Sequence, residues 1–129
     1  MFPFCAKAGI GFTAFSPLAG GWLTGKYRAG GAYPEGSRMT LRPEPYRHLE
    51  REEIYRGLDR LSSEAQSRGV DVSSLALAWV LSHPRMDAAV IGPRRPAHLD
   101  AALEALEIEL SEEGAARLAG LFTPSDASR

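Results

Sequence analysis

Two short β-prone runs, each followed by a turn and then by a helical pattern, constrain the fold of this chain most strongly. The first run, GIGFTAF at 9–15, ends at Ser16-Pro17, and the second, AAVIG at 88–92, ends at Pro93. Strands that alternate with helices pair in parallel, so this order predicts an α/β fold with a buried strand at each run. Two parallel strands bury little by themselves. Either the chain assembles with another molecule, or it is part of a larger fold.

Helical periodicity fills the sequence between the two runs. Residues 49–68 repeat apolar side chains at helical spacing with charges between them, at Ile54, Leu58, Leu61 and Ala65. Residues 74–83 are apolar nearly all round, which predicts a helix buried on most of its faces. Asp71 or Ser73 can cap this second helix, and Pro84 ends it.

The remaining segments complete one domain. A helix follows the second run and carries leucines on one face, at Leu99, Leu103 and Leu106. Ser111 is placed to cap a last short helix through Leu121. The stretch 30–47 is rich in glycine, proline and arginine without a clear period, which predicts a long surface loop. We expect one domain over 1–122 and a frayed tail at 123–129.

The composition excludes several classes of partner. The chain has 129 residues, 15 basic and 16 acidic, with a net charge of −1, so neither nucleic acid nor an anionic membrane is an expected partner. Its single cysteine, Cys5, supplies neither an internal disulfide nor a cysteine metal cluster. No apolar run approaches the roughly 18 residues that a membrane helix needs. We expect a cytoplasmic protein without a bound metal.

Five motifs in a fixed order make the chain resemble the C-terminal half of an aldo/keto reductase. They are SPLAGG at 16–21, LTGKY at 23–27, GSR at 36–38, ALAWVL at 76–81 and IGPRR at 91–95. The resemblance implies a partial (β/α)8 TIM barrel that comprises strands seven and eight with their helices. It also implies NADP(H) as cofactor, a small-molecule carbonyl substrate, and a missing N-terminal half-barrel as the structural partner.

The resemblance implies that the loop after the first strand holds the dinucleotide. Phe15 at the strand end would stack on the nicotinamide ring, while Lys26 and Arg38 would reach the phosphates. The loop itself would line the cofactor through Ser16, Pro17, Leu18, Ala19 and Gly20. Glycine suits this role because no side chain separates its backbone from a ligand. Without the resemblance, the residues favour another interpretation, in which the segment is a tight turn, Lys26 a solvated lysine and Phe15 a core residue.

The loop after the second strand is implied to hold the adenosine end of the cofactor. Gly92, Arg94, Arg95 and His98 would lie near the 2′-phosphate and the adenine, at a helix N-terminus that favours an anion. His98 stands where related sequences commonly carry glutamine. Ala102 stands where they usually carry asparagine. Alternatively, the arginines and His98 are exposed side chains on a polar surface.

No residue of this sequence matches the family's catalytic tyrosine, lysine, aspartate and histidine. The resemblance places these residues in the N-terminal half of the barrel. We therefore predict no catalytic residue here and expect the chain alone to be inactive. Two alternatives remain open: a non-catalytic module that binds a dinucleotide, and a structural remnant.

Overall fold

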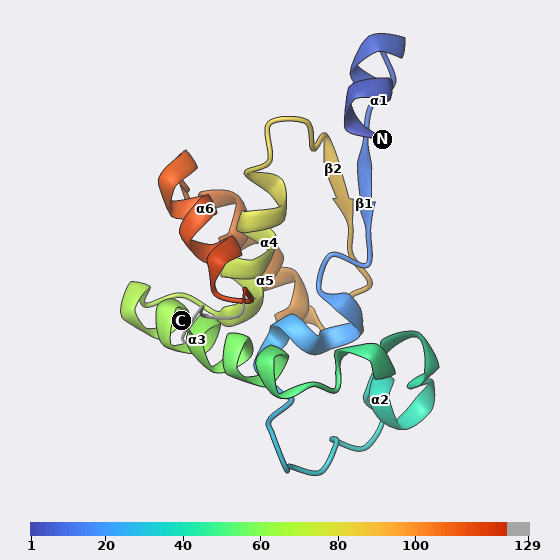
Figure 1. Cartoon of the computed structure of the whole chain (residues 1–129), viewed down its shortest axis with the longest axis vertical. Helices are drawn as coiled ribbons and strands as arrows, with labels where there is room; N and C mark the ends of the chain where they lie inside the picture. Colours follow the sequence, from blue (N-terminus) through green and yellow to red (C-terminus); the bar gives the residue numbers. More distant parts are fainter. Residues whose placement is uncertain (124–129) are drawn as a thin grey trace, which may run out of the picture.

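The computed structural model describes residues 1–123. The tail predicted at 123–129 lies outside the described residues, except for Thr123. In Figure 1 the two strands run beside one another, with α1 at one end of the molecule and α2 near the other. The elements in chain order are α1 (Phe2–Ala8), β1 (Thr13–Phe15), the 3-10 helix η1 (Ala19–Thr24), α2 (Arg38–Leu41), the 3-10 helix η2 (Glu44–Leu49), α3 (Glu52–Arg68), α4 (Val72–Leu81), β2 (Ala88–Val90), α5 (Pro96–Glu107) and α6 (Glu112–Gly120).

The two strands pair in parallel, as the order of the elements predicts. In the observed register Phe15 lies opposite Val90. Two further hydrogen bonds precede the strands: the Phe12 amide donates to the Asp87 carboxylate at 2.6 Å, and the Asp87 amide donates to the Phe12 carbonyl at 2.9 Å. The predicted α/β class is therefore confirmed, and the ends of both strands lie at the same edge of the sheet.

The prediction that both strands are buried is wrong for this chain. Each strand alternates exposed, half-buried and exposed side chains, and Phe15 at the end of β1 is 87% exposed. Two strands leave both edges of the sheet unpaired. Helix α4 packs against β2, so the side chains that point away from it face solvent. Strand β1 is also shorter than the predicted run 9–15. Gly9 belongs to the end of α1, where its left-handed conformation with φ of 65° caps the helix, and the strand itself begins at Thr13.

Helices α3 and α4 form the centre of the core. In α3 the apolar face predicted from sequence is buried at Leu58, Leu61 and Ala65. Of the two possible caps of α4, Asp71 is the one observed, and its carboxylate accepts a hydrogen bond from the Ser73 amide at 2.7 Å. The buried part of α4 begins in its first turn, at Ser74. The prediction of a helix buried on most faces is confirmed over Ser74, Leu75, Ala76, Leu77 and Ala78.

The segment 30–47 is not a simple surface loop. It contains α2 and most of η2, and within it Ser37 and Met39 are buried. Met39 packs in a cluster with Trp22, Tyr27 and Leu58, and its amide donates to the Tyr27 hydroxyl at 3.4 Å. Short helical turns of this kind carry no periodicity that a sequence window can detect.

Helix α5 packs on α4 through its small residues rather than its leucines. Ala105 is buried with Leu77 and Ala78 of α4, while the leucine face predicted from sequence is exposed at Leu99, Leu103 and Leu106. The close approach of two helices through alanine leaves no room for the larger side chains in that contact. An apolar face of α5 is therefore open in this chain.

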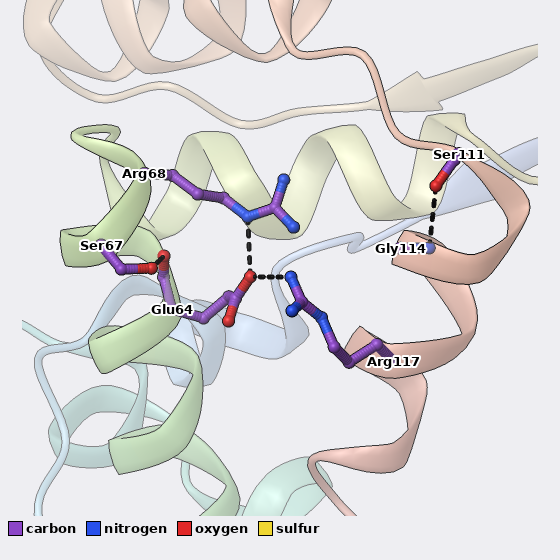
Figure 2. Close-up of polar contacts among 6 residues, drawn as sticks. All are labelled: Glu64, Ser67, Arg68, Ser111, Gly114 and Arg117. Carbon is purple, nitrogen blue, oxygen red and sulfur yellow. Dashed lines mark hydrogen bonds and ion pairs between the residues drawn. The ribbon is translucent and has the colours of Figure 1, made fainter.

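A charged contact joins α6 to α3 (Figure 2). The Glu64 carboxylate, whose side chain is only 19% exposed, accepts a hydrogen bond from Arg68 of its own helix at 2.8 Å and another from Arg117 of α6. At the start of α6, the Ser111 hydroxyl accepts a hydrogen bond from the Gly114 amide at 3.1 Å, so the predicted cap is confirmed. Beneath these polar contacts Leu118 packs into the core between α3 and α4.

Leu75 offers a direct test of this core. Its side chain is fully buried among α3, α4 and α6, whereas Leu106 of α5 is 67% exposed. We expect Leu75→Ala to lower the free energy of unfolding by about 2–5 kcal/mol, because the cavity that it leaves adds to the lost transfer energy. Leu106→Ala is the matched control and should change it by less than about 0.5 kcal/mol. Urea unfolding followed by circular dichroism measures both; equal effects of the two substitutions would contradict the packing described.

Candidate functional site

A cavity of about 780 Å³ lies where the loops after β1 and β2 meet the start of α4. Its volume is in the range of small-molecule and cofactor sites. Most of the residues predicted to bind a cofactor line it, namely Ser16, Pro17, Leu18, Gly20, Lys26, Arg38, Gly92, Arg94 and His98. The two loops are far apart in sequence, and the parallel pairing of the strands brings them to one edge.

Three of the predicted residues do not line this cavity. Phe15 projects from the end of β1 into solvent. Ala19 instead lines a second cavity beside α3. Arg95 is the N-cap position of α5 and makes no side-chain capping bond. The contacts that the family resemblance implies for these residues stay predictions, as do those for the residues that line the cavity.

The loop 16–21 has an unusual backbone. Ser16 and Ala19 have φ of 51° and 49°, and Gly20 and Gly21 have φ of 66° and 97°. Left-handed conformations are unfavourable for residues with a Cβ, so the loop stores strain at two positions and needs glycine at the next two. Its turns are closed by the Ala19 amide, which donates to the Ser16 carbonyl, and the Gly21 amide, which donates to the Leu18 carbonyl, both at 2.9 Å.

Cationic side chains gather around the cavity. Lys26 lies over the Gly21 backbone, with its ammonium 5.3 Å from the centre of the Tyr27 ring. Arg38 is exposed at the start of α2. Within residues 1–123, neither Lys26 nor Arg38 pairs with a carboxylate. One acidic residue, Asp71, also lines the cavity, where its carboxylate caps α4.

Arg94 links the loop after β2 to the segment before α2. Both terminal nitrogens of its guanidinium donate to the Gly36 carbonyl at 3.2 Å, which joins the β2–α5 loop to the segment before α2. Its own amide donates to His98 Nδ1 at 3.2 Å. A phosphate bound by Arg94 would therefore compete with a contact to a neutral carbonyl, which is the weaker acceptor of the two.

Several residues of the cavity were not predicted from the sequence. Thr24 donates its hydroxyl to the Gly21 carbonyl at 2.7 Å and so supports the glycine turn. Asp71 and Ser73 were identified as possible caps, and the start of α4 that they define is also a wall of the cavity. A capping residue in the sequence predicts where a helix begins, but it does not predict which cavity that end of the helix lines. Ala102, which stands where related sequences usually carry asparagine, packs against the core between α4 and α5.

The second cavity is smaller and apolar. It has a volume of about 300 Å³ and lies between α3, α4, α6 and η1, with Trp22, Leu58, Trp79 and Phe122 among its walls. Trp22 Nε1 at this cavity and Ser74 Oγ of α4 are buried polar atoms, and neither has a hydrogen-bond partner among the described residues. These walls offer packing but no charged group for chemistry.

The larger cavity lacks the tyrosine that the family resemblance implies as the general acid, although Lys26, Asp71 and His98 line it. Of the residues described, no tyrosine lines it, and no group of three or more histidine, cysteine, aspartate or glutamate side chains is placed to hold a metal. Tyr33 has its pKa raised by burial and by its hydrogen bond to Glu50, but it lies outside the cavity wall. Over residues 1–123 no helix combines the length and apolar character needed to cross a membrane.

The fold and the cavity define an α/β protein whose two strand-to-helix loops enclose a cationic, cofactor-sized site. The sequence profile of the Aldo/keto reductase family matches residues 1–122, so this chain belongs to that family. The resemblance found from the motifs is thereby confirmed for the family.

The chain is similar to only a part of each relative. It is 34% identical over 110 residues to a probable voltage-gated potassium channel subunit beta of Arabidopsis thaliana, covering 82% of this chain and 33% of that protein. It is 37% identical over 102 residues to the L-glyceraldehyde 3-phosphate reductase of Escherichia coli K12, covering 76% and 29%. The chain thus spans about a third of the length of these curated relatives.

A solved structure supports the fold. The glycerol dehydrogenase of Gluconobacter oxydans superposes with a TM-score of 0.74 at 22% identity, over all of this chain and 40% of that one. At this identity the likeness concerns the fold alone. The family match carries the assignment to the aldo/keto reductases, and this neighbour supports the α/β fold.

Gly20 tests the conformation of the loop that lines the cavity. At φ of 66°, a Cβ there would also stand 2.5 Å from Cζ of the Tyr46 ring, whereas a Cβ at Gly92 would meet nothing within 4 Å. We expect Gly20→Ala to cost about 1–2 kcal/mol or more of stability from the backbone alone. Gly92→Ala, on the opposite wall, is the control and should stay within about 0.5 kcal/mol of the unsubstituted chain. Urea unfolding measures both, and a Gly20→Ala chain as stable as the control would refute the left-handed loop.

Proposed function

We propose that this chain is the dinucleotide-binding part of an aldo/keto reductase that reduces aldehydes or ketones by hydride transfer from NADPH. In this proposal it corresponds to the C-terminal half of the barrel, with β1 and β2 as strands seven and eight. The observation that carries the proposal is the cavity, whose walls join the 16–21 loop to the β2–α5 loop and hold Lys26, Arg38 and Arg94. The family match adds the reaction class.

The residues around the cavity fit NADP(H). Gly20 and Gly21 line the cavity with their backbone, and Lys26, which lies over Gly21, and Arg38 would supply positive charge for a pyrophosphate. Arg94 supplies a guanidinium near the N-terminus of α5, a group that binds phosphate through two parallel hydrogen bonds. When bound, the cofactor supplies the hydride. The chain's own residues would hold its phosphates and fix its orientation.

Catalysis in this proposal requires a part of the barrel beyond these residues. A carbonyl reduction needs a group that gives a proton to the carbonyl oxygen, and no tyrosine of the described residues lines the cavity. The relatives are about three times as long as the matched region. The unpaired strand edges, with Phe15 and Val90, and the open leucine face of α5 are the surfaces that would pack against the rest of a barrel.

The proposal leaves the carbonyl substrate open and places the protein in the cytoplasm. One relative is named a reductase of L-glyceraldehyde 3-phosphate. The chain itself gives no basis for that or another specific substrate, because its cavity residues are those expected to face a cofactor. The proposal therefore names only the class, an aldehyde or a ketone.

A second function is supported by a different observation. Other relatives are named subunits of voltage-gated potassium channels, from Arabidopsis thaliana and from Oryza sativa subsp. japonica. Relatives that are named for a channel rather than for a reaction favour a module that binds a dinucleotide without turning it over. Turnover and binding measurements separate the two functions.

The isolated chain should show no measurable NADPH oxidation with simple aldehydes. Without a positioned general acid the reaction loses roughly 10²- to 10⁴-fold in rate, in addition to the loss of a substrate pocket. Absorbance at the NADPH band, measured after removal of contaminating reductases, reports the result. Turnover that persists in the purified chain and disappears with Lys26→Ala would contradict the proposal that the general acid lies in a part of the barrel beyond these residues.

Cofactor choice tests the proposed function directly. Arg94 lines the cavity and Arg95 does not, although the sequence motif makes them look equivalent. We expect Arg94→Ala to weaken NADPH about tenfold, the effect of losing one charge-assisted hydrogen bond of about 1.5 kcal/mol, and to leave NADH nearly unchanged. Arg95→Ala is the matched control. Titration calorimetry gives both affinities; no binding of either cofactor to the unsubstituted chain, or equal losses for both, would refute the assignment.

A further inference from the structure

Tyr46 contacts the strained loop from the far side of the cavity wall. It belongs to η2, 30 residues away from Ser16, and its hydroxyl oxygen lies 3.3 Å from Ser16 Oγ. Its ring lies against the backbone of Gly20, close enough that any Cβ there would collide with it. Tyr46 itself is half-buried and does not line the cavity, so it touches the loop without reaching a ligand bound there.

The loop needs support from outside because its own backbone is unfavourable. Ser16 and Ala19 hold left-handed conformations, and such residues persist only where surrounding contacts determine them. The Tyr27 hydroxyl lies 3.5 Å from the Gly20 carbonyl, at the limit of a hydrogen bond. The Tyr46 contact is shorter and acts on Ser16, the first residue of the strained loop. Of the described side chains, Tyr46 joins both ends of the loop, through its hydroxyl and its ring.

We propose that Tyr46 is a positioning residue, which holds the 16–21 loop in the shape that presents its backbone to the dinucleotide. The nature of the ligand rests on the proposed function, but the effect on the loop does not. The contact also explains why position 20 excludes a side chain on two grounds, its backbone conformation and the ring behind it. Segment 30–47 would thus support the loop through Tyr46, a residue that does not itself line the cavity.

The test removes one hydroxyl at a time from the full chain. Tyr46→Phe keeps the ring and deletes the contact to Ser16, and Ser16→Ala deletes the other partner. Tyr33→Phe is the matched control, because it removes a hydroxyl that bonds to Glu50 and Tyr55 outside the cavity. The double substitution of Tyr46 and Ser16 shows whether the two act together.

The first measurement is hydrogen exchange without any cofactor. The Ala19 and Gly21 amides close the loop, so Tyr46→Phe and Ser16→Ala should each speed their exchange several-fold, while amides in the middle of α4 keep their rates. The double variant should exchange no faster than either single one. An equal increase in the loop and in α4 would mean a general loss of stability and would overturn the proposal, as would unchanged exchange in the loop.

The second measurement is the affinity for NADPH and for NADH. A lost contact of typical net strength weakens binding about fivefold. Because the loop faces a part common to both cofactors, Tyr46→Phe should weaken NADPH and NADH by the same factor, and Tyr33→Phe neither. Unchanged affinities in a chain that binds overturn the positioning role. If the unsubstituted chain binds neither cofactor, the proposed function fails, and the exchange rates alone decide whether Tyr46 holds the loop.

Discussion

The parallel pairing of β1 with β2 is the contact on which the rest of the structure depends. It places the ends of two strands that are separated by about 75 residues at the same edge, so the loops that leave them meet. The cavity exists because of that meeting. Helix α4 then fixes the pair from one side, since its apolar surface packs on β2, on η1, on α3 and on α5. Because α4 contacts β2, η1 and α5, the position of the loops beside these elements depends on the packing of the core.

The cavity combines a rigid support with a strained rim. Leu18 packs against the core clusters around Leu75 and Leu77, while Ser16 and Ala19, on either side of the Pro17-Leu18 pair, take left-handed conformations. Leu18, in the middle of the 16–21 loop, fixes the loop to the core, while Ser16 before it and Gly20 and Gly21 after it line the cavity. The energy stored in the loop is offset by apolar burial beneath it, and so the fold and the site depend on the same contacts.

The sequence predicts helices and caps well because each depends on near neighbours. Asp71 and Ser111 cap helices as their positions suggest, and the apolar face of α3 is buried as its spacing indicates. The motifs also identify most of the cavity wall. The sequence does not predict which face of a strand or helix packs against another element. The strands are exposed rather than buried, and α5 packs on α4 through Ala105 while its leucines face solvent. Tyr46 was missed for the same reason, since its contact with Ser16 joins segments that share no local pattern.

Arg94 ties two segments together beside the cavity, and in the proposed function it would also bind a phosphate of the cofactor. Its guanidinium rests on the Gly36 carbonyl, a contact that holds the loop before α2 against the β2–α5 loop. A doubly charged phosphate is a stronger acceptor than a neutral carbonyl, so the same arginine can exchange one partner for the other. The exchange would free the segment that contains α2 and η2 from one of its ties. Tyr46, in that same segment, would still hold it to the 16–21 loop. In the proposed function, the two contacts would therefore separate recognition of the phosphate from support of the backbone beneath the cofactor.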